Sequence, residues 1–166
     1  MKTLILIRHA KSAWDVEAQS DYDRTLNARG LADAPVMGER LSQRLAQNDQ
    51  KLDALISSSA VRAEQTTCLL AQALCFPEQS IDWRRELYLA SPRTMQDLVR
   101  ELPEDVKTVA LVAHNPGVSD LVEKLTGEFF GDVPTCSVIT IAFPVSHWLD
   151  TGSWADFVDY DYPKKV

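Results

Sequence analysis

The sequence predicts an α/β fold, a three-layer sandwich with a mostly parallel central sheet between layers of helices. Two observations support this. Short apolar runs typical of buried strands alternate with longer segments that have the apolar spacing of helices. Residues 4–7 and 109–113 are apolar on both faces, as the central strands of parallel sheets are. We find no linker, repeat or low-complexity stretch, so residues 1–166 are expected to form one domain.

The strands follow from apolar runs bounded by turn residues. They are residues 4–7, 53–56, a short segment within 81–88, 109–113, 137–143 and 154–158, the last two antiparallel at an edge. The helices follow from apolar spacing and capping residues. They are 31–45 after the N-cap Asn27, a helix from the serine loop 57–59 to about residue 74, 94–102 closed by Pro103, and one opened by Asn115 and Pro116 that ends near 125. Pro35 predicts a kink in the first helix or a start near this proline.

Composition restricts the classes of function. The net charge of −7 and the pI of about 4.9 argue against nucleic-acid binding and against anionic membrane surfaces. The sequence has no apolar stretch approaching the roughly 20 residues of a membrane span, and no signal-peptide pattern. Cys68, Cys75 and Cys136 are scattered without the spacing of a metal site. We therefore expect a cytoplasmic protein with reduced thiols.

Basic and imidazole side chains stand where predicted strands end. Arg8 and His9 directly follow the strand at residues 4–7, and His114 follows the second fully apolar strand. Arg62 falls in the first turn of the helix after the serine loop. Each alone would be an ordinary polar loop or helix residue, but ligands of open α/β sheets bind at the carboxyl ends of the strands. The combination therefore predicts a shared ligand site.

The position of Arg62 indicates the charge of that ligand. A helix N-terminus carries about half a positive charge, so a cation there is unfavourable by a few tenths of a kcal/mol. An anion between the helix end and the guanidinium removes this cost. Two arginines, two histidines and two helix N-termini thus predict an anion pocket, and the fork-shaped guanidinium donors suit phosphate oxygens.

Three motifs resemble those of the histidine phosphatase superfamily. "RHAKS.W" resembles its signature, with Ala10 where glycine is commoner, "SSAVRAEQT" its second arginine motif and "VAHNPGVS" its second histidine motif. The resemblance covers nearly the whole chain. "DYDRTLNARG" and "ELYLAS" are similar to the short bacterial SixA-like phosphohistidine phosphatases. The resemblance implies a phosphoglycerate mutase-like fold without a large lid. It also implies that the protein is a phosphohydrolase that needs no metal and no cofactor.

The resemblance also implies roles for four residues. His9 is the nucleophile and becomes phosphorylated, Arg8 and Arg62 clamp the phosphoryl oxygens, and His114 donates from the other side. Physical chemistry agrees, because neighbouring positive charges favour the neutral imidazole that must attack. Phosphoryl transfer mainly needs positioning and charge stabilisation, and a covalent intermediate divides it into transfer and hydrolysis.

The general acid is less well defined by the sequence. Larger superfamily phosphatases use a carboxylate that, in many of them, follows a leucine by two positions, where this sequence has Leu89. Glu86 lies nearby and is the candidate acid. A surface carboxylate paired to Arg84 or Arg85 is the alternative interpretation of Glu86.

The length of the chain bears on the substrate. Residues 88–109 leave room for one loop and one helix, too little for a lid, so a bulky phosphorylated partner should fit. Phosphohistidine on a signalling protein, such as a histidine phosphotransfer protein, is the expected substrate. A small phosphate ester is the alternative on the same chemistry, and a non-catalytic phosphate-binding module the alternative of another class. The acidic residues Asp15, Glu17, Asp21 and Asp23 could rim the site, although we favour a solvated loop.

Overall fold

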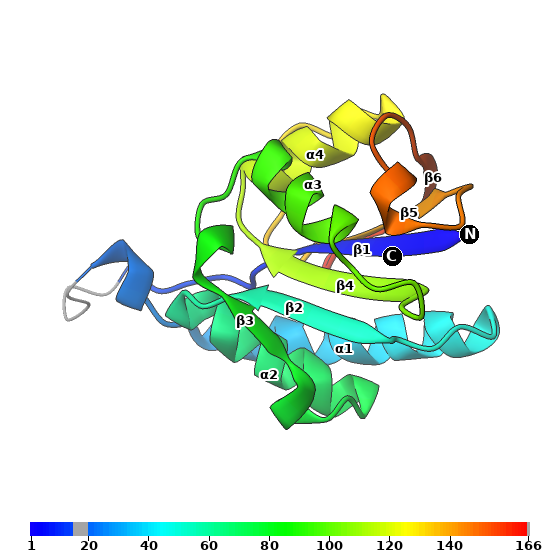
Figure 1. The fold of residues 1–166 in the computed structure, drawn as a ribbon. Helices are drawn as coiled ribbons and strands as arrows, with labels where there is room; N and C mark the ends of the chain where they lie inside the picture. Colours follow the sequence, from blue (N-terminus) through cyan, green and yellow to red (C-terminus); the bar gives the residue numbers. More distant parts are fainter. Residues whose placement is uncertain (15–19, 166) are drawn as a thin grey trace.

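The computed structural model describes residues 1–14 and 20–165 and contains a mixed six-stranded sheet flanked by helices (Figure 1). The strands are β1 (Lys2–Arg8), β2 (Ala54–Ser58), β3 (Asp82–Arg84), β4 (Thr108–Ala113), β5 (Val138–Phe143) and β6 (Asp156–Asp161). The α-helices are α1 (Ala28–Gln47), α2 (Val61–Leu74), α3 (Pro92–Arg100) and α4 (Gly117–Thr126). Short 3₁₀ turns are η1 (Asp21–Asp23), η2 (Glu78–Ser80), η3 (Arg85–Leu87) and η4 (Trp148–Asp150).

The strand order is β3-β2-β4-β1-β5-β6, and the first four of these strands are parallel. β5 runs antiparallel to β1, and β6 runs antiparallel to β5 and forms the edge. The predicted fold class is therefore confirmed. Because β1, β2 and β4 are parallel, their carboxyl ends lie together at one end of the sheet, which we call the carboxyl edge. This is the condition for a shared site.

The alternation of side chains along β1 explains the layers. Leu4 and Leu6 are buried in a cluster with side chains of α3 and α4, and Ile5 and Ile7 in a second cluster with side chains of α1 and α2. Figure 1 shows these helix pairs on opposite faces of the sheet. Successive residues of a strand point to opposite faces, so a strand with apolar residues at every position must be covered on both sides.

Helix α1 differs from its prediction at its start. Asn27 is the N-cap as expected, and its side chain accepts a hydrogen bond from the Gly30 N–H at 2.9 Å. The helix begins at Ala28 and continues through Pro35, so the expected start near this proline is wrong. A Cβ on Gly30 would lie 2.2 Å from the Lys11 carbonyl oxygen, so glycine permits the loop after β1 to pack against this helix.

The starts of α2 and α4 also need correction. Ser57 and Ser58 belong to β2 rather than to a loop, and the N-cap of α2 is Ala60, without a side-chain cap. The N-cap of α4 is Pro116 rather than Asn115. The Asn115 side chain nevertheless accepts a hydrogen bond from the Ser119 N–H in the first turn of α4, at 3.3 Å. Residue preferences in the sequence locate the start of a helix only to within a few residues, because neighbouring polar side chains can each serve as the N-cap.

Candidate functional site

Hydrogen bonds on both sides hold the backbone at the end of β1. The Arg8 N–H donates to the Ser137 carbonyl and the His9 N–H to the Ala113 carbonyl, each at 3.1 Å. The Cys136 N–H donates to the carbonyl oxygens of both Arg8 and His9 at 3.0 Å. Both side chains therefore start from a fixed backbone at the carboxyl edge of the sheet.

A pocket of about 190 Å³ opens at this edge. Its lining is Arg8, His9, Lys11, Ser12, Trp14, Arg24, Arg62, Leu89, His114, Asn115 and Thr135. Four of the five residues predicted for the site are among them. Four lining side chains carry a positive charge at neutral pH, and no carboxylate is found among the described residues of the lining. The pocket is thus suited to an anion.

His9 is held in the tautomer that a nucleophile needs. Its Nδ1 lies 2.8 Å from the Ala10 carbonyl oxygen, which can only accept, so Nδ1 carries the hydrogen. Nε2 then carries the lone pair and accepts from Nε of Arg62 at 3.3 Å. Burial lowers the pKa of His9 to about 4, and the charges of Arg62 and Arg8 act in the same direction. His9 is therefore neutral at pH 7.

His114 faces His9 across the pocket, with ring centroids 5.0 Å apart. Its Nε2 lies 2.7 Å from the Ser58 hydroxyl, whereas its buried Nδ1 has no hydrogen-bond partner among the described residues. Burial lowers the pKa of His114 to about 3, and the charges of His9 and Arg62 add to this effect. In the sequence, Ser58 is recognisable only as part of the serine loop before a helix, so its contact with His114 could not be predicted.

Arg8 has unused hydrogen-bonding capacity as well. Its Nη1 donates to the Val133 carbonyl at 2.7 Å, while its buried Nε lacks a partner in the described part of the chain. A buried polar atom without a partner costs about 1–3 kcal/mol. Phosphate oxygens bound in the pocket would remove that cost, and this agrees with the predicted clamp.

Arg62 lies in the first turn of α2, as predicted, and its side chain is almost fully buried. Its Nη1 donates to the backbone carbonyl of Asp21 at 2.6 Å and its Nη2 to Oδ2 of Asp21 at 2.9 Å. The expectation of a purely solvated acidic loop is therefore wrong for Asp21. Asp23 is exposed and accepts from Ser20, while Asp15 and Glu17 lie outside the described residues.

Two further residues of the site were not singled out from the sequence. Arg24 lines the pocket, donates from Nη2 to the Ser12 hydroxyl at 2.5 Å, and lies 3.8 Å from the centroid of the Trp14 ring. Tyr88 donates its hydroxyl to Asp21 at 2.5 Å, and its ring packs edge-on against His114 at 5.5 Å. The available signal was the motif "DYDRTLNARG", which places Asp21 and Arg24 three residues apart.

Glu86, the candidate general acid, does not line the pocket. Its side chain is half exposed, and its carboxylate accepts from Nη1 of Arg84 at 3.1 Å. This is the surface pair that the sequence left open as the alternative. Leu89 does line the pocket, with 56% of its surface exposed and a left-handed backbone φ of 50°. The acid role of Glu86 stays a prediction without support from this geometry.

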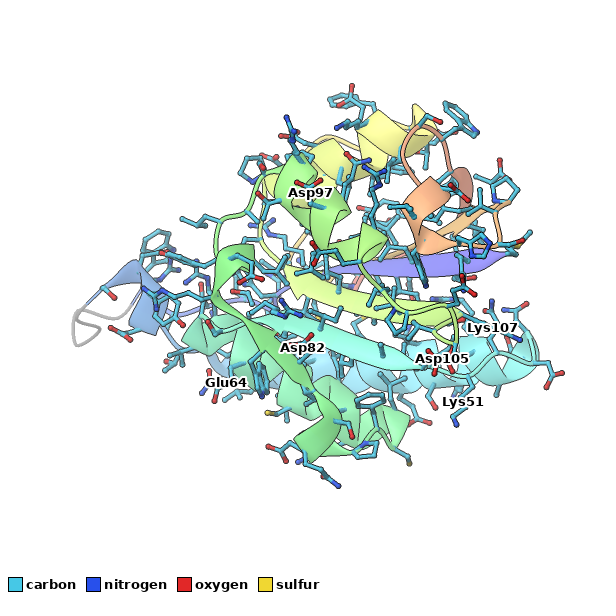
Figure 2. The ribbon with its side chains drawn as sticks, in the orientation of Figure 1. Lys51, Glu64, Asp82, Asp97, Asp105 and Lys107 are labelled. Atoms are coloured by element: carbon cyan, nitrogen blue, oxygen red, sulfur yellow. The ribbon has the colours of Figure 1, made fainter. Side chains whose placement is uncertain are left out.

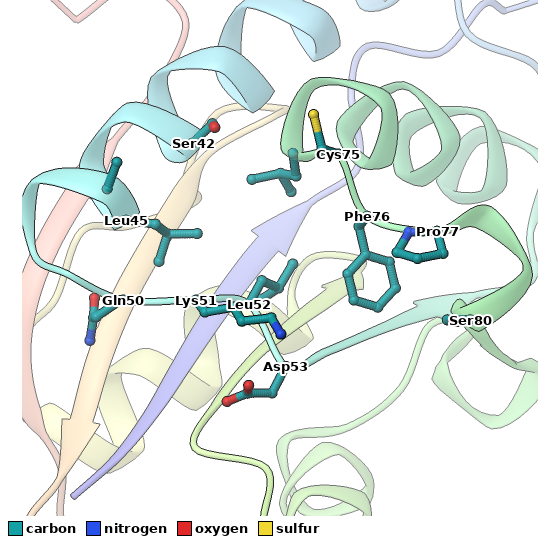
Figure 3. Close-up of a pocket in the computed structure, with 12 residues that line it drawn as sticks. Ser42, Leu45, Gln50, Lys51, Leu52, Asp53, Cys75, Phe76, Pro77 and Ser80 are labelled. Atoms are coloured by element: carbon teal, nitrogen blue, oxygen red, sulfur yellow. The ribbon is translucent and has the colours of Figure 1, made fainter.

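A larger cavity, of about 500 Å³, lies at the opposite end of the sheet, where β2 begins and α1 and α2 end (Figure 3). Leucine side chains, Phe76 and Pro77 form much of its wall, and Lys51 is its one basic residue within the described chain. Figure 2 shows Lys51 at the same end of the molecule as Asp105 and Lys107. Among residues 1–14 and 20–165, no three His, Cys, Asp or Glu side chains gather as a metal site would require.

Fold and pocket together define an α/β protein with a pocket of basic and histidine side chains at the carboxyl edge of its sheet. Residues 4–104 match the family model "Histidine phosphatase superfamily (branch 1)", and the chain belongs to this superfamily. None of the helices in the described residues has the length and apolarity needed to cross a membrane.

Similar proteins support the assignment. A Mycobacterium tuberculosis protein of uncharacterized function is 31% identical over 153 residues, which cover 87% of this chain and 90% of the relative. A structure from Agrobacterium tumefaciens assigned to the phosphohistidine phosphatase SixA is 27% identical, with a TM-score of 0.81 and 98% of each chain covered. A mycobacterial glucosyl-3-phosphoglycerate phosphatase in complex with VO₃ shares the fold, with a TM-score of 0.72, 15% identity, and coverage of 95% of this chain and 97% of that one.

Proposed function

We propose that this phosphatase removes the phosphoryl group of phosphohistidine on a partner protein, through a covalent phosphohistidine intermediate on His9. The observation that carries the proposal is the apolar Leu89 at a pocket whose described lining has no carboxylate. The described lining supplies positive charge to the phosphoryl group, and none of its residues offers a carboxylic acid to the leaving group. It therefore favours substrates whose leaving group needs no acid from the enzyme.

The first step follows from the tautomer of His9. Its Nε2 lone pair attacks phosphorus and forms a new P–N bond, while the P–N bond of the substrate histidine breaks. Solvent first protonates the other nitrogen of the substrate ring, so the electron pair of the broken bond stays on the leaving nitrogen and neutral imidazole departs. The Nδ1–H of His9 continues to donate to the Ala10 carbonyl, which stabilises the positive charge that develops on the ring.

Arg8, Arg62 and His114 act on the oxygens of the transferring group. The two guanidinium groups hold them with charge-assisted hydrogen bonds. In this proposal the Ser58 hydroxyl donates to Nε2 of His114, which assigns the ring hydrogen to Nδ1 and makes that nitrogen the further donor. Water then attacks phosphorus in the second step, the bond to Nε2 of His9 breaks with its electron pair returning to the ring, and inorganic phosphate leaves.

The leaving group decides between the candidate substrates. An alkoxide has a conjugate acid with a pKa near ~15.7 and needs a proton as it departs. An imidazole nitrogen has a pKa near ~6.5 and can be protonated by solvent. General acid catalysis contributes about 10²–10⁴-fold where it is needed. A pocket without a general acid would therefore hydrolyse alkyl phosphates more slowly by that factor, while the hydrolysis of phosphohistidine would be nearly unaffected.

Small phosphate monoesters remain the second candidate, since a phosphatase of glucosyl-3-phosphoglycerate has the same fold. The test compares kcat/KM for a ³²P-labelled histidine phosphotransfer protein with a panel of alkyl phosphates at pH 7. We expect the phosphoprotein to be preferred by about 10²-fold or more. Equal or faster hydrolysis of alkyl phosphates would make the protein a monoester phosphatase. Vanadate binding without turnover of any substrate would make it a binding module. A cytoplasmic role in phosphotransfer signalling is part of the same proposal, and preference for the phosphoprotein would support it.

A further inference from the structure

Asp21 is the meeting point of three donors from separate parts of the chain. Its Oδ2 accepts from Arg62 of α2 at 2.9 Å and from the Tyr88 hydroxyl after η3 at 2.5 Å. Its Oδ1 accepts from Nη1 of Arg24 at 2.9 Å, and its backbone carbonyl accepts from Nη1 of Arg62 at 2.6 Å. Asp21 thus binds both terminal nitrogens of the arginine that contacts His9.

Asp21 is unsuited to proton transfer. The Tyr88 hydroxyl, followed by Arg24 and Arg62, holds the pKa of its carboxyl far below the usual range, although partial burial opposes the shift. Tyr88 stays protonated near neutral pH, because burial and the bond to Asp21 raise its pKa. The carboxylate is therefore a permanently charged acceptor, and it lies outside the lining of the pocket.

We propose that Asp21 is the positioning residue of the site, which fixes the Arg62 guanidinium so that its Nε–H faces Nε2 of His9. A free arginine side chain samples many rotamers and loses that freedom when it is held in one position. The backbone carbonyl and the carboxylate of Asp21 each accept from one terminal nitrogen of Arg62, and these two bonds restrict both the position and the orientation of the guanidinium plane. The inference rests on the proposed role of His9 as nucleophile, since the attacking nitrogen is the one that Arg62 Nε meets at 3.3 Å.

The contacts of Tyr88 give Asp21 a second link to the site. The Tyr88 ring packs edge-on against both His114, at 5.5 Å, and Tyr22, at 5.0 Å. A Cβ on Gly117 would lie 2.2 Å from the Ala90 carbonyl oxygen, so glycine at the start of α4 lets the segment after Tyr88 approach closely. Asp21 therefore couples the loop after β1 to both the arginine and the histidine sides of the pocket.

The test is Asp21→Asn, with Asp23→Asn from the same 3₁₀ turn as the control. We expect Asp21→Asn to lower kcat on the phosphoprotein by roughly tenfold to a hundredfold, the effect of about 1 Å of misplacement. The inhibition constant of inorganic phosphate should stay within threefold or tighten, because a negative charge near the pocket is removed. Asp23→Asn should change neither, since Asp23 is exposed and bonded to Ser20. An unchanged kcat with tighter phosphate binding would reduce Asp21 to a distant charge and overturn the proposal.

A double-mutant cycle separates positioning from general damage to the fold. Lysine at position 62 has no fork for Asp21 to orient, so Asp21→Asn should cost less than twofold in the Arg62→Lys background. Tyr88→Phe, which keeps the charge of Asp21, should lower kcat by severalfold. Additive losses in the cycle would contradict the proposal. The same cycle measured on vanadate affinity tests Asp21 even if phosphohistidine proves not to be the substrate, so the two ideas fail separately.

Discussion

A pocket lies at each end of the sheet. The two pockets differ in volume and in the side chains that line them. The pocket at the carboxyl edge has a volume of about 190 Å³ and is lined by arginines and histidines. The cavity at the amino edge has about 500 Å³ and a wall that mixes leucines, Phe76 and Pro77 with polar side chains (Figure 3). Of the two, the smaller pocket is the one with buried polar atoms, Nε of Arg8 and Nδ1 of His114, that have no partner among residues 1–14 and 20–165. Unpaired polar groups, and not volume, therefore mark the candidate site.

The direction of the chain explains this asymmetry. At the carboxyl edge, strands lead into the N-termini of α2 and α4, whose partial positive charge favours anions. At the amino edge, α1 and α2 end, and helix C-termini carry the opposite partial charge. The two ends of the sheet thus carry helix termini of opposite partial charge, and the two pockets can be compared by mutation.

The largest effect is expected from His9→Ala, matched with Lys51→Ala at the other end. The first change should abolish turnover and leave phosphate and vanadate binding by the arginines, whereas the second should change kcat/KM by less than about twofold. Rapid quench with labelled substrate should trap an acid-labile, base-stable phosphoenzyme in the wild type. Label that survives acid would assign the nucleophile to a hydroxyl group instead.

Arg62→Lys comes next. Lysine keeps the charge but cannot form the fork that reaches Asp21 and His9, and charge-assisted hydrogen bonds contribute about 1.5–3 kcal/mol each. We expect kcat/KM to fall by roughly tenfold to a hundredfold. Arg93→Lys is the control, because the Arg93 side chain is 87% exposed. Equal values for the two variants would place Arg62 outside the reaction.

The response to pH should also distinguish buried from ordinary histidines. His9, with a pKa lowered to about 4, stays neutral until the pH falls through about 4. An unperturbed histidine with a pKa of about 6.5 would be neutral in only roughly a tenth of molecules at pH 5.5. NMR titration without phosphate should give midpoints near 4 for His9 and near 3 for His114. A midpoint of 6.5 for His9 would mean that solvent reaches the empty pocket freely.

Glu86→Gln should have the smallest effect. An exposed ion pair contributes about 0–1 kcal/mol, and Glu86 pairs with Arg84 outside the pocket. We expect less than about twofold change in kcat/KM on both phosphohistidine and alkyl phosphates, and the same for Asp82→Asn, which removes the other partner of Arg84. A loss of about 10²-fold or more confined to alkyl phosphates would support the acid role after all.

The amino-acid sequence was sufficient to predict where most strands and helices lie and which four residues near their ends come together. Apolar periodicity indicates where a strand runs, and parallel strands must end at the same edge, so Arg8, His9 and His114 could be placed together before any coordinates. Arg62 was identifiable because a cation in the first turn of a helix conflicts with the helix dipole. Their predicted roles in the chemistry remain to be tested.

The surroundings of these four residues became visible only in the folded chain. Asp21 lies 41 residues from Arg62 and 67 from Tyr88 in sequence, and no local pattern encodes the path of a loop that brings them together. The same holds for Glu86, whose side chain η3 directs to Arg84 while Leu89 reaches the pocket. Periodicity depends on neighbours within a few residues, whereas these contacts depend on how separate loops pack. That packing is why the sequence predicted the anion pocket and could not predict the residue that holds its arginine.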